Sequence, residues 1–147
     1  MSITFRHIAR ALIIDRNRML VVRMKGAHSF LPGGGVELGE GAEAALKREL
    51  REELGVTSCD IVRFLGVVEF GMEENHYHEI NHLFEVRCDG LTSDAAPPSA
   101  ESHLEFYWIE PTVEELRRHN VLPFLVQDMI PRLLSEGKPL FVSNMGE

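Results

Sequence analysis

The segment 33–56 constrains this chain more than any other part of its sequence, because it joins a glycine run to a compact group of acidic residues. Three consecutive glycines follow Pro32, and glycine backbone can approach a bound ligand closely. A helix is predicted to begin near Gly41 and to end at Gly55, a residue type common at helix C-termini. Leucines recur every four residues within it and are expected to face the core: Leu46, Leu50 and Leu54.

The acidic residues of this helix lie beside its apolar face. At about 3.6 residues per turn, Glu49, Glu52 and Glu53 occupy an arc of roughly 100°. A solvated face balanced by neighbouring Lys and Arg residues is the ordinary interpretation of such a helix. The glycine turn favours a second interpretation, because hard cations such as Mg²⁺ choose carboxylate and carbonyl oxygens and bind together with substrate phosphates. The segment therefore predicts a metal site that processes phosphates.

The spacing of these residues resembles the complete Nudix box, which would cover residues 34–56. The matching positions are Gly34, Glu40, Arg48, Glu49, Glu52, Glu53 and Gly55. So many fixed positions are far more specific than a lone glycine motif. The resemblance implies the α/β fold of the family, a Nudix α/β/α sandwich with a mixed β-sheet between helices. It also implies a hydrolase that cleaves a diphosphate linkage in a nucleoside diphosphate derivative. One departure is Gly41, where the family often has Thr or Ser, and it affects helix capping.

The resemblance further implies roles for individual residues and a cofactor, Mg²⁺ or Mn²⁺. The metal ligands would be Gly34, through its carbonyl, and Glu49, Glu52 and Glu53. The catalytic group would be Glu52, Glu53, Glu105 and Arg48, with Arg48 orienting the carboxylates. Glu40 and Gly55 would hold the box in shape. The metal would position the diphosphate and lower the pKa of the attacking water.

Residues outside the box complete the expected site. Glu105 is favoured as a base or accessory metal ligand, and Glu52, Glu101 and Glu79 are the alternatives. The expected substrate contacts are Arg23, Gly34 and Gly35. Aromatic side chains could stack on a base, although most aromatics in such positions belong to a core: Phe30, Tyr77 and Trp108.

Three histidines, His76, His78 and His82, are candidate metal ligands. His76 and His78 would share one face of an extended segment, which makes a zinc site conceivable. Their spacing matches no zinc pattern and no cysteine is near. A substrate-facing or solvated loop is therefore the preferred interpretation.

Composition is typical of a small enzyme. A length of 147 residues suits a single domain, 1–147. The net charge of −8 argues against stable nucleic-acid binding. No apolar run approaches membrane-spanning length and no secretory signal is visible, so a cytoplasmic protein is expected, with a homodimer left open. Cys59 and Cys88 are expected to be reduced core thiols.

The remaining elements are predicted from hydrophobic periodicity and turn residues. Strands are expected at 8–14 and 19–23 around the turn 15–18, at 59–70 and 80–88 around the polar segment 71–79, and at 104–109. Helices are expected at 112–119 and 124–134, with Pro131 causing a bend or an early end. Residues 138–147 are expected to be a loosely held tail.

Substrate identity is approached by elimination. Residues 71–74 lack the proline or tyrosine marks that some Nudix subfamilies carry at this distance after the box. A MutT-like nucleoside triphosphate pyrophosphohydrolase is the leading hypothesis, and ADP-ribose or a nucleotide sugar is the alternative substrate. A non-catalytic module that senses nucleotides is the third hypothesis, and the retained box carboxylates argue against it. RNA cap hydrolysis is disfavoured by the acidic charge.

Overall fold

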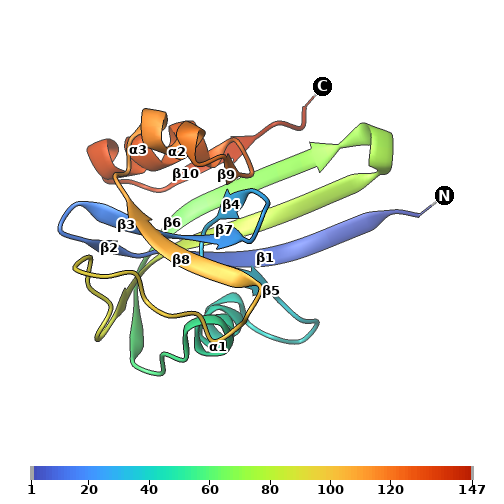
Figure 1. The fold of residues 1–147 in the computed structure, drawn as a ribbon. Coiled ribbons are helices and arrows are strands. Elements are labelled where there is room, and N and C mark those ends of the chain that lie inside the picture. The colour runs from blue at the N-terminus through green and yellow to red at the C-terminus, as the bar shows by residue number, and fades with distance from the viewer. Residues whose placement is uncertain (1, 147) are drawn as a thin grey trace.

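The computed structural model describes residues 2–146, whose larger sheet has the strand order β10-β6-β7-β1-β5 (Figure 1). Strand β1 runs parallel to β7 and antiparallel to β5, while β6 runs antiparallel to β7 and parallel to β10, so the sheet is mixed. Its strands are β1 (Thr4–Leu12), β5 (Gly33–Gly35), β6 (Cys59–Met72), β7 (Tyr77–Cys88) and β10 (Leu140–Ser143).

A smaller sheet packs beside the larger one, with the order β2-β3-β4-β9 and with β8 paired to β3. Its strands are β2 (Ile14–Asp15), β3 (Arg18–Met24), β4 (Ser29–Phe30), β8 (Leu104–Ile109) and β9 (Val121–Leu122). Arg16 and Asn17 join β2 to β3, and both have positive φ angles, 50° and 63°. This backbone matches the twist of a tight hairpin. The predicted turn at 15–18 is confirmed.

Three α-helices enclose the sheets: α1 (Ala42–Leu54), α2 (Val113–Arg118) and α3 (Val126–Glu136). In Figure 1, α1 lies on one side of the sheets, and α2 and α3 lie on the other. Leu46 and Leu50 of α1 pack in one core cluster, while Met129 and Ile130 of α3 pack in a second. The predicted α/β/α sandwich is confirmed. None of the helices within residues 2–146 is long and apolar enough to cross a bilayer.

Helix α3 differs from its predicted limits, because it continues through Pro131 to Glu136. Proline removes one backbone hydrogen bond from a helix. Met129, Ile130 and Leu133 are nevertheless buried on the inner face of α3, and this burial favours a continuous helix across the proline. The helix ends at Gly137, which adopts the left-handed conformation (φ 71°).

The predicted loose tail is wrong, because residues 140–143 form strand β10 along β6. Leu140 and Val142 pack against the core on the side of α3. Gly66 of β6 permits this approach, since a Cβ atom there would overlap the carbonyl oxygen of Leu140. The side chain of Asn144 then clasps Gly71, accepting from its N–H at 2.8 Å and donating to its carbonyl at 3.0 Å.

The predicted polar connection 71–79 is also largely strand. Strand β6 continues to Met72 and β7 begins at Tyr77, so only a short 3₁₀ turn (Glu73–Asn75) and His76 separate them. Pairing with a neighbouring strand satisfies the backbone whatever the polarity of the side chains. The long β6–β7 hairpin is therefore extended beyond its apolar core.

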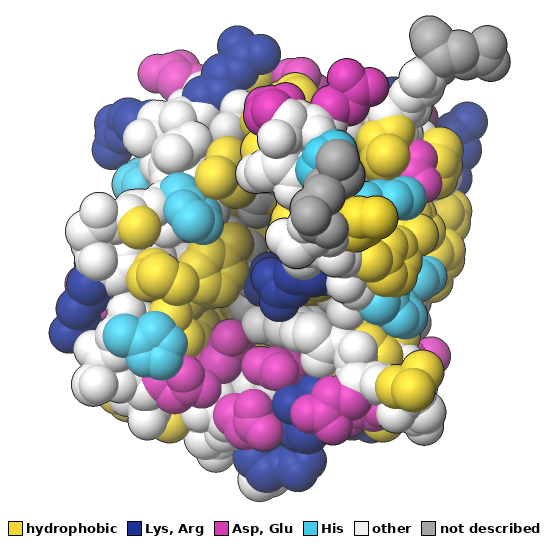
Figure 2. Space-filling view, turned by 90° about the vertical axis from the view of Figure 1, so that its right-hand side faces the viewer, with side chains coloured by type: hydrophobic (Ala, Val, Ile, Leu, Met, Phe, Trp, Pro, Cys, Tyr) yellow, Lys and Arg dark blue, Asp and Glu magenta, His cyan; other side chains and the backbone are white. Residues whose placement is uncertain are grey.

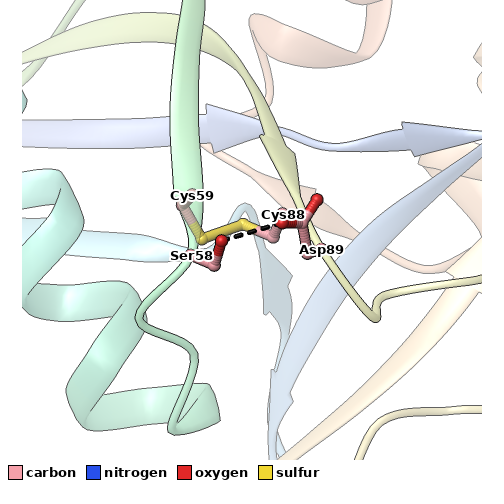
Figure 3. Close-up of a disulfide and its surroundings, with 4 residues drawn as sticks. All are labelled: Ser58, Cys59, Cys88 and Asp89. Atoms are coloured by element: carbon pink, nitrogen blue, oxygen red, sulfur yellow. Dashed lines mark hydrogen bonds between the residues drawn. A yellow bond between two sulfur atoms is a disulfide. The ribbon is translucent and has the colours of Figure 1, made fainter.

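The two cysteines form a disulfide, so the expectation of reduced thiols is wrong (Figure 3). Cys59 begins β6 and Cys88 ends β7, and the antiparallel register sets them directly opposite, with their Cα atoms 4.1 Å apart. The Ser58 hydroxyl donates to the Asp89 carboxylate at 2.8 Å beside the bond. The disulfide closes the open end of the hairpin.

We predict that reduction of this disulfide destabilises the folded protein. Cys59 and Cys88 are separated by 29 positions, and a link across such a loop contributes about 2–4 kcal/mol. Dithiothreitol should therefore lower the melting temperature by roughly 5–15 °C. The double variant Cys59→Ala/Cys88→Ala should melt near the reduced protein and show no response to the reductant. Two reactive thiols in the unreduced, denatured protein would contradict the assignment.

Candidate active site

Helix α1 carries the acidic residues, and glycines mark both of its ends. Gly41 precedes it in extended conformation and offers no side-chain cap, so the departure from the family pattern at this position removes a capping hydroxyl. Gly55 follows it with φ 71°, and its N–H donates to the carbonyl of Arg51 at 2.9 Å. The helix limits predicted from the sequence are confirmed.

Arg48 connects the helix to the loop before it. Its guanidinium makes a two-point contact with Glu40, at 2.8 and 2.9 Å, and donates to Glu49 at 3.0 Å. A further N–H donates to the carbonyl of Gly35 at 3.0 Å. The contact with Arg48, together with the Glu37 backbone N–H, lowers the pKa of Glu40 to about 2. The hydrogen bonds to Glu40 are also the main cause that raises the pKa of Arg48 above its usual value.

The acid row is the group of glutamates Glu49, Glu52 and Glu53 on α1. Glu53 is its buried member, with 5% of its surface exposed. The backbone N–H of Gly33 donates to its Oε1 at 3.1 Å. Burial raises the pKa of Glu53 to about 8, against the lowering effects of the Gly33 N–H and of the positive charge on Arg10. Negative charges on Glu49 and Glu101 raise the pKa further. A buried acid of this kind would be stabilised by a nearby cation.

The glycine loop, Gly33–Gly35, packs against the carboxylate of Glu49. A Cβ atom at Gly34 would lie 2.5–2.8 Å from the Glu49 carboxyl atoms, so no other residue fits there without displacing that side chain. Gly33 has φ 134°, and a Cβ atom there would lie 2.1 Å from the carbonyl oxygen of Ala9. The glycines thus serve close packing in this structure.

The donor set fits a hard divalent cation. Glu49 lies against Gly34, Glu53 is bonded to Gly33, and Glu52 is 52% exposed at the outer edge of the row. Within residues 2–146, no three side chains of Asp, Glu, His or Cys form a closed cation site. Backbone carbonyls, water and substrate phosphates are the ligands that commonly complete a magnesium site.

A pocket of about 450 Å³ opens beside the glycine loop. Figure 2 shows this face, where hydrophobic side chains border a hollow that contains Lys or Arg atoms, with acidic side chains gathered beneath it. The pocket is lined by Arg6, Arg10, Met24, His28, Phe30, Gly33, Gly34, Phe70, Met72, Tyr77, Glu79, Leu122, Pro123 and Phe124. An apolar pocket with a few converging polar groups is typical of a small-molecule site.

Two arginines of β1 belong to this pocket, and the sequence analysis missed them. Arg6 and Arg10 lie on the same strand face as the buried residues Ile8 and Leu12. Arg10 donates to the carbonyl of Leu31 at 3.0 Å, and its guanidinium lies 5.1 Å from the centre of the Phe30 ring. Charged residues at the inward positions of a strand were the available signal.

Of the aromatic residues proposed for stacking, Phe30 and Tyr77 line the pocket. Trp108 does not line it, and its indole N–H donates to the carbonyl of Ala95 at 3.0 Å. Phe70 and Phe124 line the pocket without having been singled out from the sequence. Their rings meet edge to face, with centres 6.0 Å apart.

Arg23, Glu101 and Glu105 do not line the pocket. Arg23 and Glu105 are direct neighbours across β3 and β8, and the Arg23 Nε–H donates to Glu105 at 2.7 Å. Glu101, in the loop before β8, is the outside carboxylate whose charge acts on Glu53. The adjacent Ala100 N–H donates to the main-chain carbonyl of Glu53 at 2.8 Å. The loop that carries Glu101 is therefore fixed directly to α1.

The three histidines do not face the pocket. His76 has a left-handed backbone (φ 50°) in the turn before β7, so it does not share an extended face with His78. Because side chains alternate along β7, His78 and His82 point away from the face that carries Tyr77 and Glu79. His82 shares a 2.9 Å hydrogen bond with His7 of the neighbouring strand.

Comparisons with known proteins place this geometry in a family. The model of the NUDIX domain matches residues 5–126. None of the curated proteins matches the chain.

Solved structures share the fold at low sequence identity. A NUDIX hydrolase from Nitrosomonas europaea is 19% identical, with a TM-score of 0.72 over 92% of this chain and 93% of that one. The MutT protein from Methanosarcina mazei Go1 is 23% identical, with a TM-score of 0.69 over 94% and 99% of the two chains. A UDP-X diphosphatase is 19% identical, with a TM-score of 0.67 over 97% and 68%.

The matched region contains the whole glycine loop, the acid row and all the residues that line the pocket. Nudix hydrolases generally use a divalent metal and act on small nucleotide substrates. The chain belongs to the Nudix family and is a pyrophosphohydrolase.

Proposed function

We propose that this Nudix hydrolase cleaves a phosphoric anhydride bond of a nucleoside triphosphate, as a MutT-like pyrophosphohydrolase that uses Mg²⁺ or Mn²⁺. The observation that carries the proposal is the continuity of the acid row, the glycine loop and an aromatic pocket, which meet at Gly33 and Gly34. Phosphates would lie along the loop beside the acid row. The nucleoside would occupy the pocket.

The size of the pocket is compatible with this substrate, because about 450 Å³ is enough for a nucleoside. A second pocket of about 400 Å³ shares Met72 and Tyr77 with the first, so the other half of ADP-ribose or of a nucleotide sugar would also find space. The likeness in fold to a UDP-X diphosphatase keeps nucleotide sugars as the second candidate to be assayed.

Each group around the loop has a proposed role. Gly34, Glu49, Glu52 and Glu53 would hold the metal, which when bound supplies charge neutralisation and a lowered pKa for a coordinated water. Arg48 fixes Glu49 and the Gly35 carbonyl, and Glu40 fixes Arg48. Arg10 places positive charge where the loop meets the pocket, and we assign it the phosphate contact expected of Arg23. Positioning and electrostatic stabilisation would supply most of the acceleration.

We propose Glu101 as the carboxylate outside the box that accepts a proton from the attacking water, in place of Glu105. Its charge acts on Glu53, and its loop is bonded to the end of α1. The carboxylate of Glu105 is engaged by Arg23. Glu52, which is exposed and only 3.4 Å from Arg48, is the alternative base within the box.

The substrate class can be tested with a panel of nucleoside triphosphates, ADP-ribose, nucleotide sugars and dinucleoside polyphosphates. Each would be incubated with Mg²⁺ or Mn²⁺, and the products identified by mass. A nucleoside monophosphate and pyrophosphate from a triphosphate are the expected products. Exclusive turnover of a nucleotide sugar would overturn the triphosphate assignment.

We expect Glu53→Gln to lower kcat by about 100-fold or more, because it removes a carboxylate from the proposed metal site while keeping its shape. Its matched control is Glu43→Gln, which changes an exposed glutamate in the first turn of the same helix and should be nearly neutral. Steady-state kinetics across a magnesium titration would measure both. Undiminished wild-type activity in excess chelator would refute a metal site.

We further expect the metal-free protein to lose stability as pH rises from about 5 to 8. Glu53 stays protonated in the folded state up to a pKa of about 8, against 4.5 for an ordinary glutamate. The folded state therefore binds more protons in this window, and the free energy of unfolding falls as pH rises. In chelator, the stability difference between wild type and Glu53→Gln should shift across this window. A difference that is constant with pH would contradict the raised pKa.

The base assignment predicts different pH–rate profiles for three variants. Glu101→Gln should lower kcat by about 100-fold or more and abolish the acidic limb of the wild-type profile. Glu105→Gln should remain within a few-fold of wild type, because it disrupts only an exposed ion pair. If Glu52→Gln alone abolishes the limb, the base lies in the box.

A further inference from the structure

Strand β7 carries a polar cluster of Tyr77, Glu79 and Asn81, and the first two of these line the floor of the pocket. Glu79 and Asn81 are 8% and 1% exposed. The Tyr77 hydroxyl donates to one carboxyl oxygen of Glu79, and the Asn81 amide donates to the other at 3.2 Å. These contacts fix the orientation of a carboxylate that itself lines the pocket.

This cluster has unused hydrogen-bonding capacity. Each oxygen of a carboxylate can accept two hydrogen bonds, and each Glu79 oxygen accepts one within residues 2–146. No Lys, Arg or His of the described chain forms an ion pair with Glu79 within 4.0 Å, and Asn81 Oδ1 has no hydrogen-bond partner there. Buried polar groups without partners are costly in a finished core. Glu79, which lines the pocket, is suited to meeting a ligand.

Aromatic side chains line the pocket: Phe30, Phe70, Tyr77 and Phe124. The ring of Phe70 meets those of Tyr77 and Phe124, with ring centres 6.4 and 6.0 Å apart. Aromatic side chains bind bases by stacking, whatever the base. In a pocket of this kind, the choice among bases would fall to the polar residues.

We infer that Glu79 selects guanine, an inference that rests on the proposed hydrolysis of nucleotides. Guanine presents two adjacent donors, N1–H and the N2 amino group, which match the two oxygens of a carboxylate. Adenine and cytosine each present a ring-nitrogen acceptor beside their amino group, and uracil presents carbonyl acceptors on both sides of N3–H. Each of these bases would turn an acceptor toward Glu79.

Arg6 supplies the complementary donor. It is the neighbour of Glu79 across the parallel pairing of β1 and β7, and it also lines the pocket. Arginine is the side chain most often bonded to the O6 and N7 acceptors of guanine. A carboxylate beside an arginine thus matches the donors and acceptors of one base, and the glycine loop lies within reach for its phosphates.

The test compares kcat/KM for GTP, ITP, XTP, ATP, CTP and UTP. Hypoxanthine in ITP lacks only the 2-amino group of guanine, so the wild type should prefer GTP over ITP by about 10-fold or more, mainly through KM. Glu79→Gln should lower kcat/KM for GTP by about 10- to 100-fold. The same variant should raise kcat/KM for XTP relative to that for GTP. The glutamine amide can donate to the O2 of xanthine while its oxygen accepts from N1–H.

Two controls separate base recognition from structural damage. Glu74→Gln changes an exposed residue in the turn before β7 and should leave the order of substrates unchanged. Calorimetric binding of GMP and IMP in chelator gives a readout that needs no turnover, and the preference for GMP should disappear in Glu79→Gln.

The outcomes distinguish this inference from the function on which it rests. If no nucleotide is hydrolysed, the proposed function fails. If nucleoside triphosphates are hydrolysed but ATP, CTP or UTP is as good a substrate as GTP, the function stands and the guanine assignment is overturned. If Glu79→Gln lowers kcat/KM equally for every substrate, Glu79 supports the fold and does not recognise the base.

Discussion

The contact between the glycine loop and helix α1 is the constraint on which the site depends. Gly34 leaves no room for a side chain beside the Glu49 carboxylate, and Gly33 bonds to Glu53 one turn further along the helix. Arg48 closes the arrangement by bonding to Glu40, Glu49 and the Gly35 carbonyl together. The glycine loop is also strand β5, which pairs with β1. The acid row and the arginines of β1 are therefore held by the same loop. A shift of the loop would move both halves of the site.

The carboxylates of the site experience opposite environments within one short segment. Glu40 faces a guanidinium, which holds its pKa near 2, whereas burial raises that of Glu53 to about 8. The first group is thus a permanently charged anchor that organises Arg48. The second carries its charge at neutral pH only when positive charge is brought near. This difference divides the acidic residues into those that shape the box and those suited to hold a cation.

Local sequence signals predicted the parts of the molecule whose causes are local. Spacing along one helix identified the acid row, and the glycines at its ends marked its limits. The β2–β3 hairpin followed from four residues that favour a tight turn. The disulfide, strand β10 and the bond from the Glu101 loop to α1 depend on partners brought together only by the fold. The sequence alone gives no direct sign of such contacts, because they depend on tertiary pairing.

Strand alternation explains why the pocket itself was harder to predict. Arg6 and Arg10 of β1 and Tyr77 and Glu79 of β7 line the pocket, so the floor is polar where a sheet face is ordinarily apolar. Each strand taken alone looks only like an imperfect alternation. The parallel register sets Arg6 opposite Glu79. The polar residues of the two strands therefore form one surface that carries both donors and acceptors. Under the function proposed above, phosphate chemistry would depend on α1 and the glycine loop, while the choice of nucleobase would depend on β1 and β7.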